Sequence, residues 1–286
     1  MNTLEIKQQI EDYRKKVESE VVFDKNKHIY QRIEDGYFLT GVTTILGVKS
    51  KEFLQFWAAK EAVKSLGWYD LKEGDDEDKQ NLFKRYSEIV QMDVDSYWRE
   101  LDNAKKAHTA KAREGQKKGK IVHEFCEQYI KNKIDPSMFP APSIPLEDEM
   151  VANSIRLFLN WEESNKVEWL ASEMMVWSPE HLFAGTIDWL AIVNNIFTLG
   201  DIKTNNQLSE DVILQTGGYN LCLREGGINP EQRLVLRIPK SGDGFEAKVI
   251  STDLDFDCQS FLSLRNVHRW NLYLEKFKDE NGKLCF

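Results

Sequence analysis

Two apolar segments joined by a two-residue turn constrain the fold of this chain more than any other feature. Residues 183–193 (FAGTIDWLAIV) and 196–203 (IFTLGDIK) flank Asn194-Asn195. Asn tolerates positive φ, so this pair suits the type I′ turn of a β-hairpin. Val193 then faces Ile196, and counting back along both strands places Asp188 directly opposite Asp201.

The charges in this hairpin stand out because both of its faces are otherwise apolar, as in an internal strand pair. Opposed carboxylates repel each other unless a cation lies between them or one is protonated. Side chains alternate along a strand, so Lys203 projects on the same side as Asp201. Two carboxylates beside a lysine predict a Mg²⁺ or Mn²⁺ site for phosphodiester hydrolysis. The alternative is a plain ion pair between Asp201 and Lys203 at a strand end.

Hydrophobic periodicity and turn residues predict an α/β fold with a mixed central β-sheet flanked by helices. The N-terminal part, residues 1–115, is predicted to be an accessory part of short strands and helices packed on a core at 116–286, in one compact unit. Helices are expected over 1–20, 51–68, 80–115, 119–132, 147–163, 209–223 and 257–278, strands within 21–46 and over 167–177, 232–239 and 245–252, and a loop at 73–79.

The charge is distributed unevenly along the chain. The net charge is −9, which disfavours a protein that coats DNA non-specifically. Residues 104–120 nevertheless contain seven Lys or Arg and one acidic residue. This basic segment is a candidate contact for a phosphate backbone, or else the solvated face of a helix. Its candidate nucleic-acid-binding residues are Lys111, Arg113, Lys117, Lys118 and Lys120.

The chain has no apolar run of the roughly 20 residues that span a bilayer, and its N-terminus is polar. We therefore expect a soluble, intracellular protein without a membrane partner. Cysteines stand at 126, 222, 258 and 285, without the spacing of a metal site. Reduced thiols are expected, and no iron–sulfur cluster.

Further motifs accompany the hairpin. Gly185-Thr186-Ile187-Asp188 and Asp201-Ile202-Lys203-Thr204 lie on its strands, and Glu173 precedes it. A histidine motif (119-GKIVHE-124) and a Gln-x-x-x-Tyr motif (215-QTGGY-219) lie on predicted helices. In this order the motifs resemble the PD-(D/E)xK nuclease superfamily, in its RecB-like and phage-type exonuclease branch. The resemblance covers about residues 23–223, and it implies a restriction-endonuclease-like core.

The resemblance also implies roles for individual residues. Metal ligands would be Asp188, Asp201, the backbone carbonyl of Ile202, His123 and Glu173. Lys203 would polarise the attacking water, and Gln215 and Tyr219 would line the site from one helix face. Simpler interpretations remain for two of them, because His123 could pair with Glu127 on a helix surface and Tyr219 could belong to the core.

The resulting hypothesis is a Mg²⁺- or Mn²⁺-dependent deoxyribonuclease, in particular an exonuclease that leaves 5′-phosphate and 3′-hydroxyl ends. The resemblance places it in phage or prophage recombination or repair, in the cytoplasm of a bacterium or infected host. DNA, a phage recombination protein and a second copy of the chain are the candidate partners. The alternatives are a structure-specific endonuclease, an inactive nuclease-like DNA-binding module, and an unrelated hydrolase with a chance Asp/Lys pair.

Overall fold

The computed structural model describes residues 2–49, 52–67, 76–242, 244–280 and 282–284. It divides into two compact units, one made of Met1–Lys49 with Gly119–Phe286 and the other of Ser50–Lys118. The boundary at 118/119 lies close to the expected one at 115/116. Residues 1–49, however, group with the core, because their strands extend the central sheet and their first helix packs on strand β4.

The smaller unit consists of helices. It contains α3 (Glu52–Ser65), α4 (Asp76–Val90) and the first part of α5 (Val94–Ile134), which continues into the larger unit. Arg85 of α4 forms an ion pair with Glu100 of α5, and the ammonium of Lys111 lies 2.9 Å from the Glu61 carboxylate of α3. Of the loop expected at 73–79, residues 73–75 lie outside the described residues, and Asp76 already opens α4.

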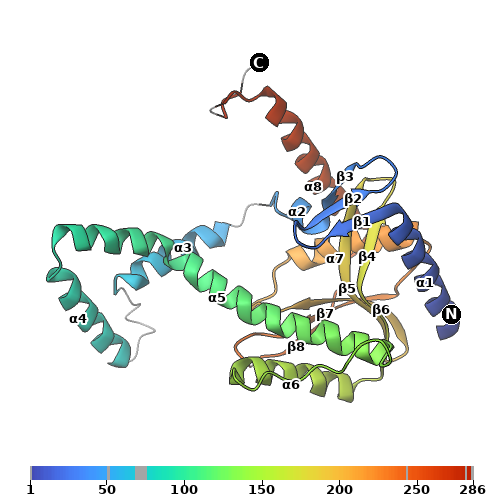
Figure 1. Cartoon of the computed structure of the whole chain (residues 1–286), viewed down its shortest axis with the longest axis horizontal. Helices are drawn as coiled ribbons and strands as arrows, with labels where there is room; N and C mark the ends of the chain where they lie inside the picture. Colours follow the sequence, from blue (N-terminus) through green and yellow to red (C-terminus); the bar gives the residue numbers. More distant parts are fainter. Residues whose placement is uncertain (1, 50–51, 68–75, 243, 281, 285–286) are drawn as a thin grey trace. The chain divides into compact units, whose positions relative to one another are not determined.

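The larger unit is built on a mixed eight-stranded sheet, which confirms the predicted α/β class (Figure 1). The strand order is β1-β2-β3-β5-β6-β7-β8, and β4 pairs with β5. The β3–β5 and β6–β7 pairs are parallel, and the others are antiparallel. The strands are β1 (Val21–Asp24), β2 (Ile29–Arg32), β3 (Phe38–Gly41), β4 (Val167–Ser178), β5 (Phe183–Val193), β6 (Ile196–Lys203), β7 (Gln232–Arg237) and β8 (Glu246–Val249).

Helices enclose the sheet with two hydrophobic clusters. One cluster joins the strands to α1 (Thr3–Glu20), α2 (Val42–Leu46), α7 (Asp211–Glu225) and α8 (Leu254–Leu274). The other joins them to the end of α5 and to α6 (Glu149–Ser164). A short 3₁₀ turn, η1 (Glu275–Phe277), follows α8. No helix in the described part of the chain is long and apolar enough to cross a bilayer.

One expectation about the first strands was wrong. Residues 42–46, expected within the strand region, form helix α2 after β3 ends at Gly41. Val42, Ile45 and Leu46 recur at helical spacing and are all buried in the cluster with α7 and α8. The side chains therefore reach the core from a helical turn, as their spacing of three and four residues allows.

The hairpin register is confirmed. Asn194 and Asn195 have φ values of 52° and 69°, as a type I′ turn requires. Regular pairing runs from Val193–Ile196 to Trp189–Gly200. The Trp189 ring covers Gly200 so closely that any Cβ there would collide with it. Pairing ends at this point, so Asp188 and Asp201 are the next two facing positions beyond the ladder.

The strands diverge around Asp188. The edge of β5 that faces away from β4 is shared: β3 pairs with Phe183–Ala184, and β6 pairs with Trp189–Val193. Residues 185–188 lie between these two ladders, without a strand partner on that edge among the described residues. β3 ends at Gly41 and β6 at Lys203, so their carboxyl ends approach each other along β5. We call this gap the fork, and it is where the hairpin carboxylates lie.

Candidate functional site

Asp188 replaces the missing ladder contact with its side chain. Its Oδ2 accepts a hydrogen bond of 2.6 Å from the backbone N–H of Ile202. Burial would raise the pKa of this carboxyl, but the hydrogen bond and charge of His123, together with Lys203, hold it below its usual value. Asp188 is therefore a fixed anion at the fork.

Asp201 is the most deeply buried charge of the site. The residue has no exposed surface, and its Oδ1 accepts no hydrogen bond among the described residues. The Lys203 ammonium lies 2.6 Å from Oδ2, which confirms that these two side chains share one side of β6. Burial, with a smaller effect of Asp188, raises the pKa of Asp201 to about 6 despite the nearby lysine. Oδ1 is thus a buried acceptor that still lacks a partner.

Lys203 remains a cation in this setting. Burial favours its neutral form, but the charges of Asp201 and Asp188 outweigh burial and raise its pKa above the usual value. Its ammonium can donate hydrogen bonds to a water or a phosphate oxygen near neutral pH. It is poorly suited to accept a proton there.

His123 lies on α5. The glycine that begins its motif, Gly119, allows α5 to pack closely against the end of β6. The preceding Gly119 lies against Thr204 after β6, where a Cβ would collide with the Thr204 side chain. The Nε2 of His123 lies 3.4 Å from Oδ2 of Asp188. Burial disfavours the imidazolium, but the hydrogen bond and charge of Asp188 prevail and raise the pKa of His123 to about 9.

Glu173 faces the fork from β4. The pairs Ser172–Trp189 and Met174–Ile187 place it opposite Asp188. Its φ of 49° is unusual for a residue other than glycine, and such backbone conformations cluster at functional sites. Burial and the charge of Asp188 raise the pKa of Glu173 to about 7. This carboxyl can therefore exchange a proton near neutral pH.

Glu127 also belongs to this group, although its sequence position predicts only a pairing with His123 on a helix surface. Ligand atoms of His123, Glu127 and Glu173 all lie within 4.8 Å of one another. Glu127 is one turn after His123 and also pairs with Lys131. The i, i+4 spacing with His123 was visible in the sequence. The approach of Glu173 from β4 was not.

Gln215 and Tyr219 line the site from α7. The Gln215 Nε2 donates a 2.9 Å hydrogen bond to the Tyr219 hydroxyl, and both side chains are buried. Burial, with the charges of Asp188 and Asp201, raises the pKa of Tyr219 well above its usual value. Tyr219 covers Gly185, where a Cβ would lie 2.5 Å from its ring. It is therefore both part of the core and a neighbour of the carboxylates.

A second tyrosine reaches β5 at the fork. The hydroxyls of Tyr30, from β2, and Thr186 lie 2.9 Å apart. This contact ties the N-terminal strands to the unpaired stretch of β5. We assign Tyr30 no chemical role.

The donor set fits a hard divalent cation. Donor atoms of His123, Glu127 and Glu173 lie within 4.8 Å of one another. The Asp188 carboxylate lies beside this group, 3.4 Å from His123, and Asp201 lies next to Asp188. Such oxygen-rich surroundings suit Mg²⁺ or Mn²⁺. The buried Asp201 Oδ1 without a partner is the observation that supports this fit best, because an unpaired buried carboxylate oxygen is costly. The structure therefore brings together His123, Glu173, Asp188, Asp201 and Lys203, as predicted, and adds Glu127.

The predicted nucleic-acid-binding residues do not all belong to the same unit as these side chains. Lys111, Arg113, Lys117 and Lys118 lie in the smaller unit, whereas Lys120 lies in the larger one. Lys111 pairs with Glu61, and Lys120 lies 3.5 Å from Glu124. Arg113 and Lys117 are exposed cations on α5. Their role as a backbone contact stays a prediction.

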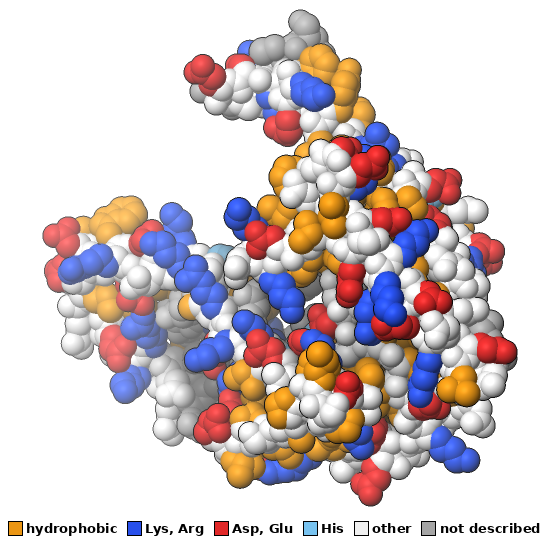
Figure 2. All heavy atoms as spheres, turned by 45° about the vertical axis from the view of Figure 1, so that its right-hand side comes forward, with side chains coloured by type: hydrophobic (Ala, Val, Ile, Leu, Met, Phe, Trp, Pro, Cys, Tyr) orange, Lys and Arg blue, Asp and Glu red, His pale blue; other side chains and the backbone are white. Residues whose placement is uncertain are grey.

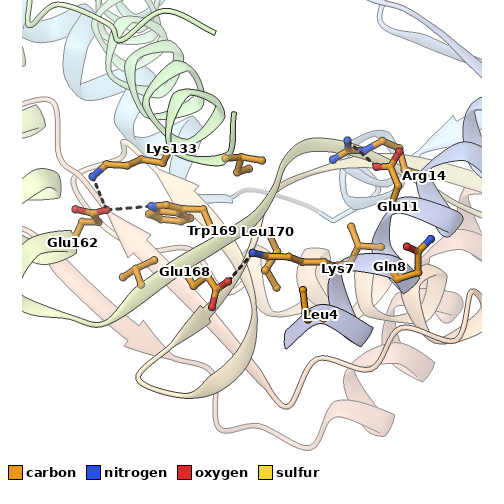
Figure 3. A pocket seen from close by; sticks show the side chains of 13 residues that line it. Leu4, Lys7, Gln8, Glu11, Arg14, Lys133, Glu162, Glu168, Trp169 and Leu170 are labelled. Carbon is orange, nitrogen blue, oxygen red and sulfur yellow. Dashed lines mark hydrogen bonds and ion pairs between the residues drawn. The ribbon is translucent and has the colours of Figure 1, made fainter. Parts of the chain in front are cut away.

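A cleft of about 650 Å³ lies elsewhere on the larger unit, between α1, α6, β4 and the end of α5 (Figure 3). Its charges are neutralised within the chain. Lys7 lies 2.7 Å from Glu168, and Lys133 lies 3.6 Å from Glu162. None of the fork residues lines this cleft. We therefore place the chemistry at the fork.

The cysteines of the described residues form no disulfide. Cys126, Cys222 and Cys258 are buried free thiols. Cys285 lies outside the described residues.

Comparison with known proteins does not identify the chain, because no family model and no curated protein matches it.

Proposed function

We propose that this chain is a metal-dependent deoxyribonuclease of the PD-(D/E)xK type, with its active site at the fork. The proposal is carried by the buried Asp201 carboxylate, whose Oδ2 pairs with Lys203 while its Oδ1 has no partner among the described residues. Sequence motifs and geometry coincide at this point. A chance Asp/Lys pair would not also gather His123, Glu173 and Tyr219.

The side chains suggest a division of labour. A bound Mg²⁺ or Mn²⁺ would be held by Asp188, Asp201, His123, Glu173 and the backbone carbonyl of Ile202, and would supply Lewis acidity. Lys203, a cation, would hold a phosphate oxygen as negative charge develops on it. Glu173, opposite Asp188 across the β4–β5 pair, would help to hold the metal or position the attacking water. Gln215 and Tyr219 would fix the wall of the site.

The decisive experiment compares wild type with Asp201→Asn and Lys203→Ala on end-labelled DNA with Mg²⁺, Mn²⁺ or EDTA. We expect each substitution to lower cleavage by about a thousandfold or more, because each removes charge stabilisation from the transition state. Asp12→Asn, on the exposed face of α1, is the matched control and should cleave normally. Full activity of Asp201→Asn would refute the site.

Folding of the variant can be checked at the same time. Asp201 is ionised at neutral pH against its raised pKa of about 6, so its charge costs the metal-free fold about 1–3 kcal/mol. Asp201→Asn should therefore unfold in EDTA at a temperature equal to or above that of wild type. Inactivity together with a lower unfolding temperature would indicate damage to the fold instead.

Within this class we favour an exonuclease, on the resemblance of the motifs alone. A closed circular duplex distinguishes it from a structure-specific endonuclease, since only the endonuclease cuts the circle. An inactive binding module would give neither cleavage nor a calorimetric signal with Mn²⁺.

We further propose a cytoplasmic role in phage recombination or repair, which accords with the buried free thiols.

A further inference from the structure

All but the first turn of α8 is unusual in an acidic protein. The chain has 47 Asp and Glu residues and a net charge of −9, yet no acid occurs from Cys258 to Leu274. The same stretch contains Arg265 and Arg269. Two cations therefore share a helix segment without an acidic neighbour on that segment.

Arg265 lacks a counter-charge. The residue is only 8% exposed, and its hydrogen bond is to Oδ1 of the adjacent Asn266, at 3.3 Å. No described carboxylate forms an ion pair with it. Burial and the charge of Arg269 both lower the pKa of its guanidinium. A buried cation without an anion is costly, so an anion from outside the chain would stabilise this arrangement.

Aromatic side chains extend the same face. Arg265, Arg269 and Tyr273 follow one another at i, i+4 and i+8, so they line one side of α8. Tyr273 is 54% exposed, and the neighbouring Trp270 is 58% exposed. Figure 1 shows that the C-terminal half of α8 projects beyond the sheet, and Figure 2 shows hydrophobic, basic and some acidic side chains on this projecting end.

We propose that this face of α8 binds a single strand of nucleic acid. The guanidinium groups of Arg265 and Arg269 take backbone phosphates, and the exposed rings of Tyr273 and Trp270 stack on bases. Charge complementarity favours a polyanion over an apolar protein partner. Exposed rings favour unpaired bases, whose faces are free for stacking. The proposal rests on the proposed function, since the strand bound here would be the substrate or a product of the nuclease.

The test measures binding by fluorescence anisotropy with a labelled single strand and with a duplex of the same sequence. EDTA is present throughout, so cleavage cannot interfere. The full chain is compared with Arg269→Gln, with Arg265→Gln/Arg269→Gln, and with Tyr273→Leu. Arg156→Gln on α6, at a half-buried arginine 2.8 Å from Glu149, removes the same charge elsewhere and is the control.

We expect the double variant to bind the single strand about tenfold more weakly or worse. The slope of log binding constant against log salt concentration should become shallower by about 1.4, because two phosphate contacts are lost. Tyr273→Leu should weaken single-strand binding about fivefold and leave duplex binding unchanged. Arg156→Gln should match wild type. Arg269 is exposed, so Arg269→Gln tests the proposal even if loss of Arg265 disturbs folding.

Unchanged affinity and salt dependence in both arginine variants would overturn the proposal. So would a wild type that is stabilised against heat by inorganic phosphate but not by the single strand, because the ligand would then be a small phosphate. Wild-type cleavage with Mg²⁺ and Mn²⁺ is assayed separately. Its absence would refute the proposed nuclease activity, whereas the binding comparison decides the role of α8 by itself.

Discussion

Glu124 and Glu127 lie on the same helix, three residues apart, but differ in their surroundings. Glu124 is exposed and pairs with Lys120, whereas Glu127 joins His123 and Glu173. We predict that Glu127→Gln weakens Mn²⁺ binding about tenfold, as loss of a ligand or of its support does. Glu124→Gln, its matched control, should bind Mn²⁺ like wild type in calorimetry. Equal affinities for the two variants would place Glu127 outside the metal site.

Some residues of the site can be predicted from the sequence pattern, and others cannot. Asp188, Asp201 and Lys203 could be placed because one turn fixes their register, and register is a local property. Glu127 could not, since its role depends on Glu173, which reaches it from a separate strand. The positive φ of Glu173 was equally hidden. No residue type in its vicinity signals that conformation.

Among the elements, β5 depends on a glycine where the fork opens. A Cβ on Gly185 would lie 2.5 Å from the Tyr219 ring and 3.1 Å from Val42. We predict that Gly185→Ala lowers the free energy of unfolding by about 1–3 kcal/mol, because one side chain must move. Urea unfolding followed by circular dichroism would measure this. The Gly185→Ala substitution should also lower activity, since the displaced Tyr219 ring borders the carboxylates of Asp188 and Asp201.

A double-mutant cycle with Tyr219→Leu supplies the control for this prediction. If the ring causes the strain, Gly185→Ala should cost clearly less in the Tyr219→Leu background. An equal cost in both backgrounds would place the strain in the backbone or at Val42.

Prediction of the elements succeeded where the chain interacts with its near neighbours. The hairpin, α6 and β4 fall within a few residues of their expected positions. The parallel pairing of β3 with β5 had no local signal. Helix α2 was missed because its five residues are too short for periodicity to identify.

The metal-free molecule carries several protons that its unfolded chain would release. Asp201, Glu173 and His123 have pKa values raised from 3.8, 4.5 and 6.5 to about 6, 7 and 9. Each group binds its proton more tightly in the folded state. Its contribution to stability is therefore present below the unfolded pKa and lost as pH rises through the folded value. We predict that the metal-free chain loses stability between about pH 4 and pH 9.

Thermal unfolding from about pH 5 to about pH 9, with EDTA or with excess Mg²⁺, would measure this trend. Mg²⁺ should reduce the loss at high pH, because a metal favours the deprotonated ligands. Asp201→Asn should remove the part of the slope near pH 6. A metal-free unfolding temperature that rises steadily over this range would contradict the prediction.

The pairing of Thr40 with Phe183 has a further consequence, for the order of events during synthesis. The two residues are 143 positions apart, so β3 leaves the ribosome long before its partner strand has been made. Contacts of such separation form late because a long loop must close first. We expect the fork to be completed only when nearly all of its sheet has emerged, so a partly translated chain would carry no assembled catalytic site.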